Sequence, residues 1–210
     1  MGSGGDLRGE ELSSLRAAID REMTQAVAEL GSLLDSASPD DLRRPSVGTR
    51  WTNRQLLFHM VFGYCVVRSL MPLVHTLGRL GWSRRFAATL NAGRGPFHVV
   101  NYAGSVVGGQ VLPTSVVLRL MHQTVAALER RLDRETAQSL ALTMCFPTDW
   151  DPYFRPVMKV EDVYRYGRLH FSHHRRQLTM CESAGQSSHD SADDAFRSME
   201  MSSRVPGTRR

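Results

Sequence analysis

Three histidines have the side-chain type and the spacing needed to bind one divalent cation. His170 and His174 lie four positions apart, so on a helix they project from the same face. Imidazole nitrogens bind such ions at about 2.0–2.1 Å, and a third ligand must then come from another part of the fold. His59, within an apolar helical run far upstream, is the candidate. Three protein ligands leave at least one coordination position open, which is typical of a catalytic metal site.

Each histidine also has an ordinary interpretation, which the sequence leaves open. His59 alone fits a core histidine satisfied by a hydrogen bond. His170 and His174 fit a solvent-facing basic patch with Arg175 and Arg176 beside them. If the pair faces inward instead, each unsatisfied imidazole costs about 1–3 kcal/mol, so an inward pair needs a ligand or a hydrogen-bond network.

Other residues capable of chemistry have simpler explanations, and no catalytic residue is assigned. Capping and solvation explain four acids near turns or a helix start: Asp149, Asp151, Glu161 and Asp162. Ser172 lacks the strand-turn-helix context of a hydrolase nucleophile. Cys65 and Cys181 can approach the histidines from the same helices, but small buried thiols are common and reactivity requires a lowered pKa.

The composition of the 210 residues fits a single domain, because 41% of them are hydrophobic and can build one continuous core. The net charge is +5, but the basic residues are nearly all arginines, and Lys159 is the only lysine. The chain has no dense basic cluster interleaved with aromatic residues, as strand-binding proteins have. We therefore expect no nucleic-acid partner, with an arginine-rich groove as the open alternative.

The cysteines and the apolar segments predict a cytoplasmic protein without membrane association. The three cysteines are odd in number and lack metal-type spacing, so they suit a reducing compartment. The N-terminal residues lack the charged and apolar regions of a signal peptide. The longest apolar run, 56–74, contains His59, Arg68 and Pro72, which favours a buried helix over a membrane span.

Apolar residues that recur every three or four positions predict an all-α four-helix bundle with long connections. The four expected helices cover about 12–33, 52 to beyond Pro72, 114–132 and 160–181. A short helical piece is expected at 83–90, whereas the glycines from 93 to 109 make that stretch hard to keep helical throughout. Residues 141–156 predict an ordered loop rich in prolines and aromatic side chains, and no strand pattern requires a sheet.

Within this bundle, the histidines should face the interior. His59 shares an inward stripe with Leu56, Met60, Gly63 and Val67. His170 and His174 share a stripe on the last helix. Lys159, at the start of that helix, offers no side-chain cap. We expect a flexible N-terminus over 1–9, the bundle over 10–182 and a disordered tail over 183–210. The apolar first helix offers a surface for a homodimer.

Two segments carry a recognisable pattern, namely WTNRQLLFHM at 51–60 and HFSHHRRQL at 170–178. In order and spacing they resemble the two signatures of the DinB/YfiT-like superfamily, and the resemblance covers about 10–181. It implies a four-helix bundle in which one histidine of the second helix and two of the last helix hold a divalent metal. Carried over by position, these ligands are His59, His170 and His174, while His173 occupies a position that is not a ligand.

The resemblance also implies an activity. Members of the superfamily include thiol S-transferases that use bacillithiol or mycothiol, and mycothiol-dependent maleylpyruvate isomerase. We therefore expect metal-dependent transfer of a low-molecular-weight thiol to an electrophilic small molecule, and the arginine-rich composition, typical of a high-GC actinobacterial chain, favours mycothiol. Zinc, nickel, iron and manganese all suit imidazole ligands. A metal-dependent hydrolase and a non-catalytic metal-binding stress-response bundle are the alternatives.

Overall fold

The computed structural model describes residues 3–80 and 82–180, so that Cys181 and the tail predicted over 183–210 lie outside the described residues. The elements, in chain order, are the helices and strands α1 (Ser3–Ser36), α2 (Pro39–Arg43), α3 (Asn53–Leu80), α4 (Ser83–Ala92), α5 (Arg94–Val111), α6 (Thr114–Leu132), α7 (Ala137–Leu140), β1 (Thr143–Cys145), β2 (Val157–Lys159) and α8 (Val160–Arg175).

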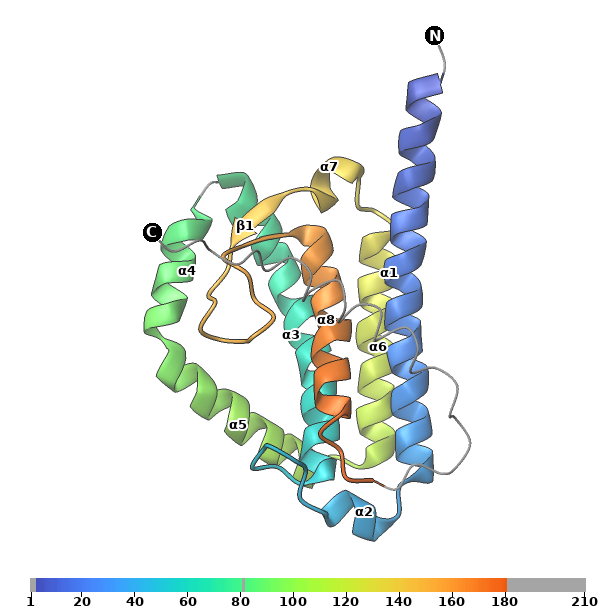
Figure 1. Cartoon of the computed structure of the whole chain (residues 1–210), viewed down its shortest axis with the longest axis vertical. Coiled ribbons are helices and arrows are strands. Elements are labelled where there is room, and N and C mark those ends of the chain that lie inside the picture. The colour runs from blue at the N-terminus through green and yellow to red at the C-terminus, as the bar shows by residue number, and fades with distance from the viewer. Residues whose placement is uncertain (1–2, 81, 181–210) are drawn as a thin grey trace, which may run out of the picture. The chain divides into compact units, whose positions relative to one another are not determined.

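Four long helices form the bundle that the sequence predicts. Helix α1 packs against α6, α6 against α3, α3 against α8, and α8 against α1, so the four helices close into a ring (Figure 1). Fully buried side chains from all four helices fill the centre, among them Met23, Tyr64, Met121 and Phe171. The apolar stripes read from the sequence therefore meet in one core, and the all-α bundle is confirmed.

Helix α3 is the central element of the site and the most apolar helix of the bundle. By length and hydropathy it could cross a membrane, but 56% of its most apolar window is buried inside the protein. His59, Met60 and Val67 lie on its buried side, as the sequence predicts. The helix is thus packed as a core helix of a soluble protein is.

The glycine-rich stretch differs from the sequence expectation, because α5 is one continuous helix. Its glycines allow close packing against α3. A Cβ atom on Gly109 would lie 2.6 Å from the Cα of Gln55, and one on Gly108 would lie 2.2 Å from the ring of Phe58. Residues that weaken an isolated helix are required here for contact with α3, so tertiary packing overrides local propensity.

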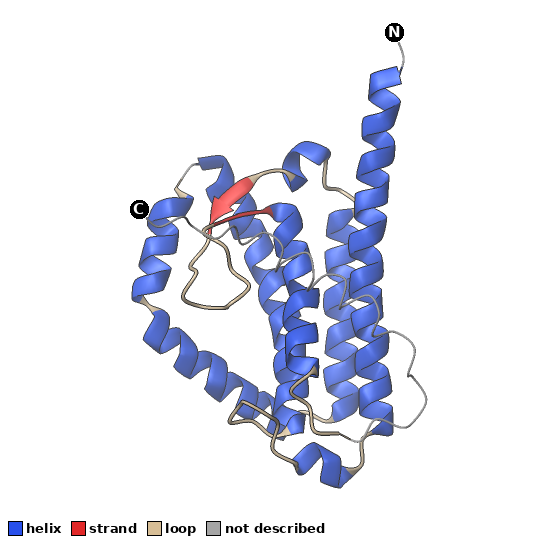
Figure 2. Cartoon of the chain, in the orientation of Figure 1, coloured by secondary structure: helices blue, strands red, loops and turns tan. Residues whose placement is uncertain are grey.

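A small antiparallel sheet was also missed (Figure 2). Strand β1 pairs with β2 so that Met144 lies opposite Met158, and both side chains are buried. Three-residue strands are too short to show an alternating pattern in the sequence. The strands hold the two ends of the loop 146–156 together, and the rings of Phe146 and Phe154 pack 5.3 Å apart inside it. The loop is therefore ordered by its aromatic residues, as predicted.

The ends of the outer bundle helices shift from their expected positions. Helix α1 begins at Ser3, within the range expected to be a flexible N-terminus. Helix α8 ends at Arg175 and not near residue 181, because the chain beyond it bonds to the start of α3. There the N–H of Thr179 donates to Oδ1 of Asn53 at 3.1 Å. The predicted helix end was wrong because this contact with α3 replaces further helical turns.

The start of helix α8 is capped, although the side chain of Lys159 was expected to offer no cap. The carboxylate of Asp162 accepts a hydrogen bond from the backbone N–H of Lys159 at 2.8 Å. An acidic residue in the third helical position can satisfy the N-cap N–H in this way. The capping role predicted for Asp162 is confirmed, although Lys159 itself supplies no cap.

Candidate metal centre

The start of α3 fixes the direction in which His59 enters the core. The hydroxyl of Thr52 accepts from the N–H of Gln55 at 3.4 Å, while the side-chain oxygen of Gln55 accepts from the N–H of Thr52 at 3.0 Å. This reciprocal pair satisfies donors that the first helical turn leaves free. Asn53 is fully buried and donates to the backbone oxygen of Asp41 at 2.7 Å, which ties α3 to α2. His59 lies about two turns farther along this anchored helix.

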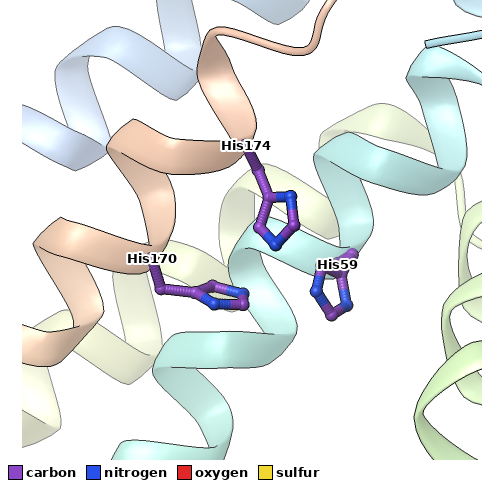
Figure 3. Close-up of side chains that lie close together, drawn as sticks. All are labelled: His59, His170 and His174. Carbon is purple, nitrogen blue, oxygen red and sulfur yellow. The ribbon is translucent and has the colours of Figure 1, made fainter. Parts of the chain in front are cut away.

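The three predicted histidines come together between α3 and α8 (Figure 3). Their ring centroids are 4.8 Å apart for His59 and His170, 4.7 Å for His59 and His174, and 4.5 Å for His170 and His174. One ring nitrogen of each lies within 4.8 Å of one nitrogen of each of the others. His59 and His170 expose only 3% and 5% of their surface, and His174 is half-buried. The cluster faces inward, which removes the solvent-facing interpretation of His170 and His174.

Each ring uses its Nδ1 atom for a hydrogen bond to a different part of the protein. Nδ1 of His59 lies 3.0 Å from the hydroxyl of Ser105 on α5. Nδ1 of His174 lies 2.7 Å from the side-chain oxygen of Gln177. Such outer partners fix the tautomer and the orientation of metal-binding histidines. The Nε2 atoms are thereby left to act as ligands.

His170 is held by Asp151, in the loop between β1 and β2, and by Tyr166, one turn earlier on α8. Its Nδ1 lies 3.4 Å from Oδ2 of Asp151 and 3.3 Å from the hydroxyl of Tyr166, which itself donates to Asp151 at 2.8 Å. Nε2 of His170 is buried and has no hydrogen-bond partner among the described residues. A buried, unpartnered imidazole nitrogen that faces two other histidines is the donor arrangement that a metal ion would satisfy.

Gly63 provides the space for the ring of His170. A Cβ atom at this position would lie 2.5 Å from Cδ2 and 2.9 Å from Nε2 of that ring. Any residue with a side chain at position 63 would therefore displace the imidazole of His170. The sequence places Gly63 on the inward stripe, but only the packing of α8 on α3 shows what its missing side chain permits.

The electrostatics keep the imidazoles in the form that binds metal. Burial, together with His170 and His174 nearby, lowers the pKa of His59 to about 2. Burial and the neighbouring His170 lower the pKa of His174 to about 4. Both rings are therefore neutral at pH 7. Burial alone would raise the pKa of Asp151, but hydrogen bonds from His170, Tyr153 and Tyr166 hold it below its ordinary value, so the carboxylate stays charged.

Asp151 corrects the sequence interpretation, which assigned it to capping and solvation. Its carboxylate orients His170 instead. The loop carries it there, because its backbone turns at Pro152 and Asp151 also accepts from the N–H of Tyr153 at 2.9 Å. Ser105 was likewise missed, since it lies in the stretch whose helix was not expected. No local pattern identifies either residue, because both meet their histidines only after distant segments pack.

Other candidate residues lie apart from the three nitrogens. His173 bonds through Nδ1 to the hydroxyl of Tyr153 at 3.1 Å and does not belong to the cluster, as the resemblance implies. Cys65 lies 3.6 Å from the hydroxyl of Thr124 on α6, and burial raises the pKa of its thiol. Cys65 is therefore a packed core thiol, and a nucleophilic role for it finds no support.

A comparison with known families decides the relationship of the chain. A family model of the DinB superfamily matches residues 22–178, which include the three histidines and parts of all four bundle helices. The chain belongs to the DinB superfamily. No curated protein matches it, and no solved structure does. This superfamily is a metal-binding one, and in the present DinB superfamily member the cluster of His59, His170 and His174 could hold the ion.

The histidine cluster of this DinB superfamily protein opens into a cavity of about 220 Å³. All three rings line it, and α3, α8 and the loop 146–156 form much of its wall. Trp51 stands at the cluster, with its ring 4.4 Å from that of His59 and 5.9 Å from that of Tyr102. An ion held by the histidines would thus face a largely apolar cavity in which a small molecule can bind.

Proposed function

We propose that this protein is a metal-dependent enzyme that transfers a low-molecular-weight thiol, mycothiol or a close analogue, to an electrophilic small molecule. His59, His170 and His174 hold one divalent ion. The observation that carries the proposal is the arrangement of their rings: each Nδ1 is engaged by the protein, and the Nε2 atoms are left free beside a cavity. A closed structural site would have no such adjoining space.

The residues of the chain prepare this site for a thiol. When bound, the ion supplies a Lewis acid that lowers the pKa of a thiol or a water at its open position. Ser105, Asp151 and Gln177 hold the imidazoles in place, and the cavity beside them has a largely apolar lining. In the transfer, the S–H bond breaks and its proton passes to solvent. A C–S bond then forms to the electrophile as the bond from that carbon to its leaving group breaks, and the leaving group departs with the bonding electron pair.

The cavity favours thiol transfer over hydrolysis. Attack by water usually requires a carboxylate or histidine free to accept its proton. Among the described lining residues, the only acid is Asp151, which is already bonded to Tyr166 and His170. The one described lining histidine outside the cluster, His173, is bonded through Nδ1 to the hydroxyl of Tyr153. A thiol is acidic enough that metal binding alone produces its reactive form near neutral pH. We place the reaction in the cytoplasm, where small thiols are kept reduced.

The metal site is tested by mass-spectrometric metal analysis of the native protein and of the triple variant His59→Ala, His170→Ala and His174→Ala. About one equivalent of ion per chain is expected in the native protein and none in the variant. His122→Ala, at an exposed position on α6, is the matched control and should retain the ion. A native protein that stays metal-free after addition of zinc, nickel, iron or manganese would overturn the proposal.

The activity is tested with 1-chloro-2,4-dinitrobenzene, from which chloride leaves as the C–S bond forms. We expect formation of the mycothiol adduct to be at least about 100-fold slower in His59→Ala than in the native protein. Turnover of an ester without any added thiol would establish the hydrolase instead. If the protein binds metal but shows no turnover with mycothiol, bacillithiol or glutathione, the interpretation as a non-catalytic metal-binding bundle would remain.

A further inference from the structure

We propose that the cavity beside the three histidines selects a neutral, apolar electrophile. Its size is that of one aromatic ring or of two fused rings. The assignment of this molecule as the electrophile rests on the proposed thiol transfer, whereas its binding in the cavity does not. Three properties of the cavity support this selectivity: the side chains that line it, the charge of this lining and the volume of the cavity.

One wall is a row of apolar side chains along α3. Phe62, Val66, Leu70 and Leu73 follow His59 at intervals of three or four residues, so they share one helix face over about 20 Å. All four line the cavity and are only half-buried. The apolar lining therefore continues along α3 away from the metal ligands.

Further apolar lining comes from segments outside the four bundle helices. Phe86 of α4, Met144 of β1, and Phe146 and Trp150 of the following loop all line the cavity. All four side chains are apolar or aromatic, and the three aromatic rings offer planar surfaces for stacking. A ligand in the cavity would bury its own apolar surface against these side chains, with a gain of about 25 cal/mol for each Å².

The charge of the lining disfavours an ionic ligand. Among the described residues that line the cavity there is no lysine or arginine, and the single acid, Asp151, is bonded to Tyr166 and His170. Burial of a carboxylate without a cationic partner costs several kcal/mol. A dicarboxylate such as maleylpyruvate would therefore find no partner other than the ion itself. Asn101 of α5 offers one neutral amide for a carbonyl or nitro group.

The volume limits the size of the ligand. An apolar cavity of about 150 Å³ accommodates benzene. The cavity here measures about 220 Å³, which leaves room for a substituted benzene or a naphthalene-sized molecule.

The test measures binding by isothermal titration calorimetry on protein freed of metal with a chelator, so that no probe can ligate an ion. The probes are 2-naphthalenemethanol, 2-naphthoate and 2-naphthylmethylammonium, which share one ring system and differ in charge. We expect the neutral alcohol to bind at least tenfold more tightly than either ion. Equal or tighter binding of either ion, or no binding of the alcohol, would overturn the proposal.

A pair of variants on α3 locates the probe. Leu70→Arg adds a cation to the cavity wall, while Ser69→Arg adds the same charge at an exposed position one residue away. The first should weaken binding of the alcohol at least tenfold and tighten binding of 2-naphthoate, whereas the second should change neither. Unchanged affinities in a folded Leu70→Arg protein, checked by circular dichroism, would show that the probe binds elsewhere. If that variant fails to fold, the three-probe series on the native protein still decides.

These measurements separate the two proposals. Selective binding of the alcohol to a protein without thiol transferase activity would leave the cavity assignment intact and remove the reaction. Thiol transfer with no preference for the neutral probe would keep the reaction and remove the selectivity.

Discussion

At the scale of single residues, the site depends on groups that are not metal ligands. Asp151 and Tyr166 hold His170, and Gly63 leaves room for its ring. The carboxylate contributes charge as well as position, because an anion on the far side of an imidazole makes the ring a better donor. Replacing such a partner should therefore change metal affinity without changing the three ligands.

We predict that Asp151→Asn weakens zinc binding by about 10- to 100-fold, since it keeps the shape of the side chain but removes the charge beside His170. Competition with a chromogenic zinc chelator measures the change in Kd. Asp149→Asn, an exposed position in the same loop, is the matched control and should keep the native affinity. An unchanged Kd in Asp151→Asn would show that Asp151 does not position His170.

At the scale of elements, α5 is the helix that tertiary packing had to stabilise. It delivers Ser105 to His59 and Asn101 to the lining of the cavity, although its glycines weaken it as an isolated helix. The close approach to α3 at Gly108 and Gly109 compensates for that weakness. Stability and site geometry are therefore coupled through one interface between two helices.

We predict that Gly109→Ala lowers the free energy of unfolding by about 1–3 kcal/mol, because the new Cβ would overlap the backbone of Gln55. Gly104→Ala on the same helix meets nothing within 4 Å and should raise stability by about 0.5–1 kcal/mol. Urea unfolding followed by circular dichroism compares the two. Stabilisation by both substitutions would mean that α5 does not pack against α3 at Gly109.

At the scale of the whole molecule, the buried histidines make stability depend on pH. The pKa of His59 is about 2 and that of His174 about 4 in the folded protein, against 6.5 for an ordinary histidine. Between those values the unfolded chain binds more protons than the folded one, so unfolding is favoured as the pH falls. The stability from these neutral rings is complete above about pH 6.5 and is lost progressively below it.

We predict that the free energy of unfolding of the metal-free protein falls as the pH drops from 7 to 4.5. His59→Gln should remove about 1.4 kcal/mol per pH unit from that slope below pH 6, because one titrating group is gone. The exposed His122→Gln is the control and should leave the slope unchanged. Equal slopes for native and His59→Gln proteins would contradict the low pKa of His59.

The sequence alone determined the four bundle helices, their inward stripes and the three histidines. These follow from local rules, since helical periodicity fixes which residues share a face and the two segments at 51–60 and 170–178 carry the resemblance. It also predicted the ordered loop, because prolines and aromatic residues limit the conformations of 146–156. Strands of three residues left no pattern to detect.

Only the tertiary structure decided what surrounds the histidines. Ser105 lies 46 residues from His59, and the loop that carries Asp151 to His170 is held at its two ends by the pairing of β1 with β2. The continuity of α5, the early end of α8 and the apolar lining of the cavity depend in the same way on contacts between distant segments. Periodicity records which side of a helix is buried, but the partner that buries it is set by how the helices pack.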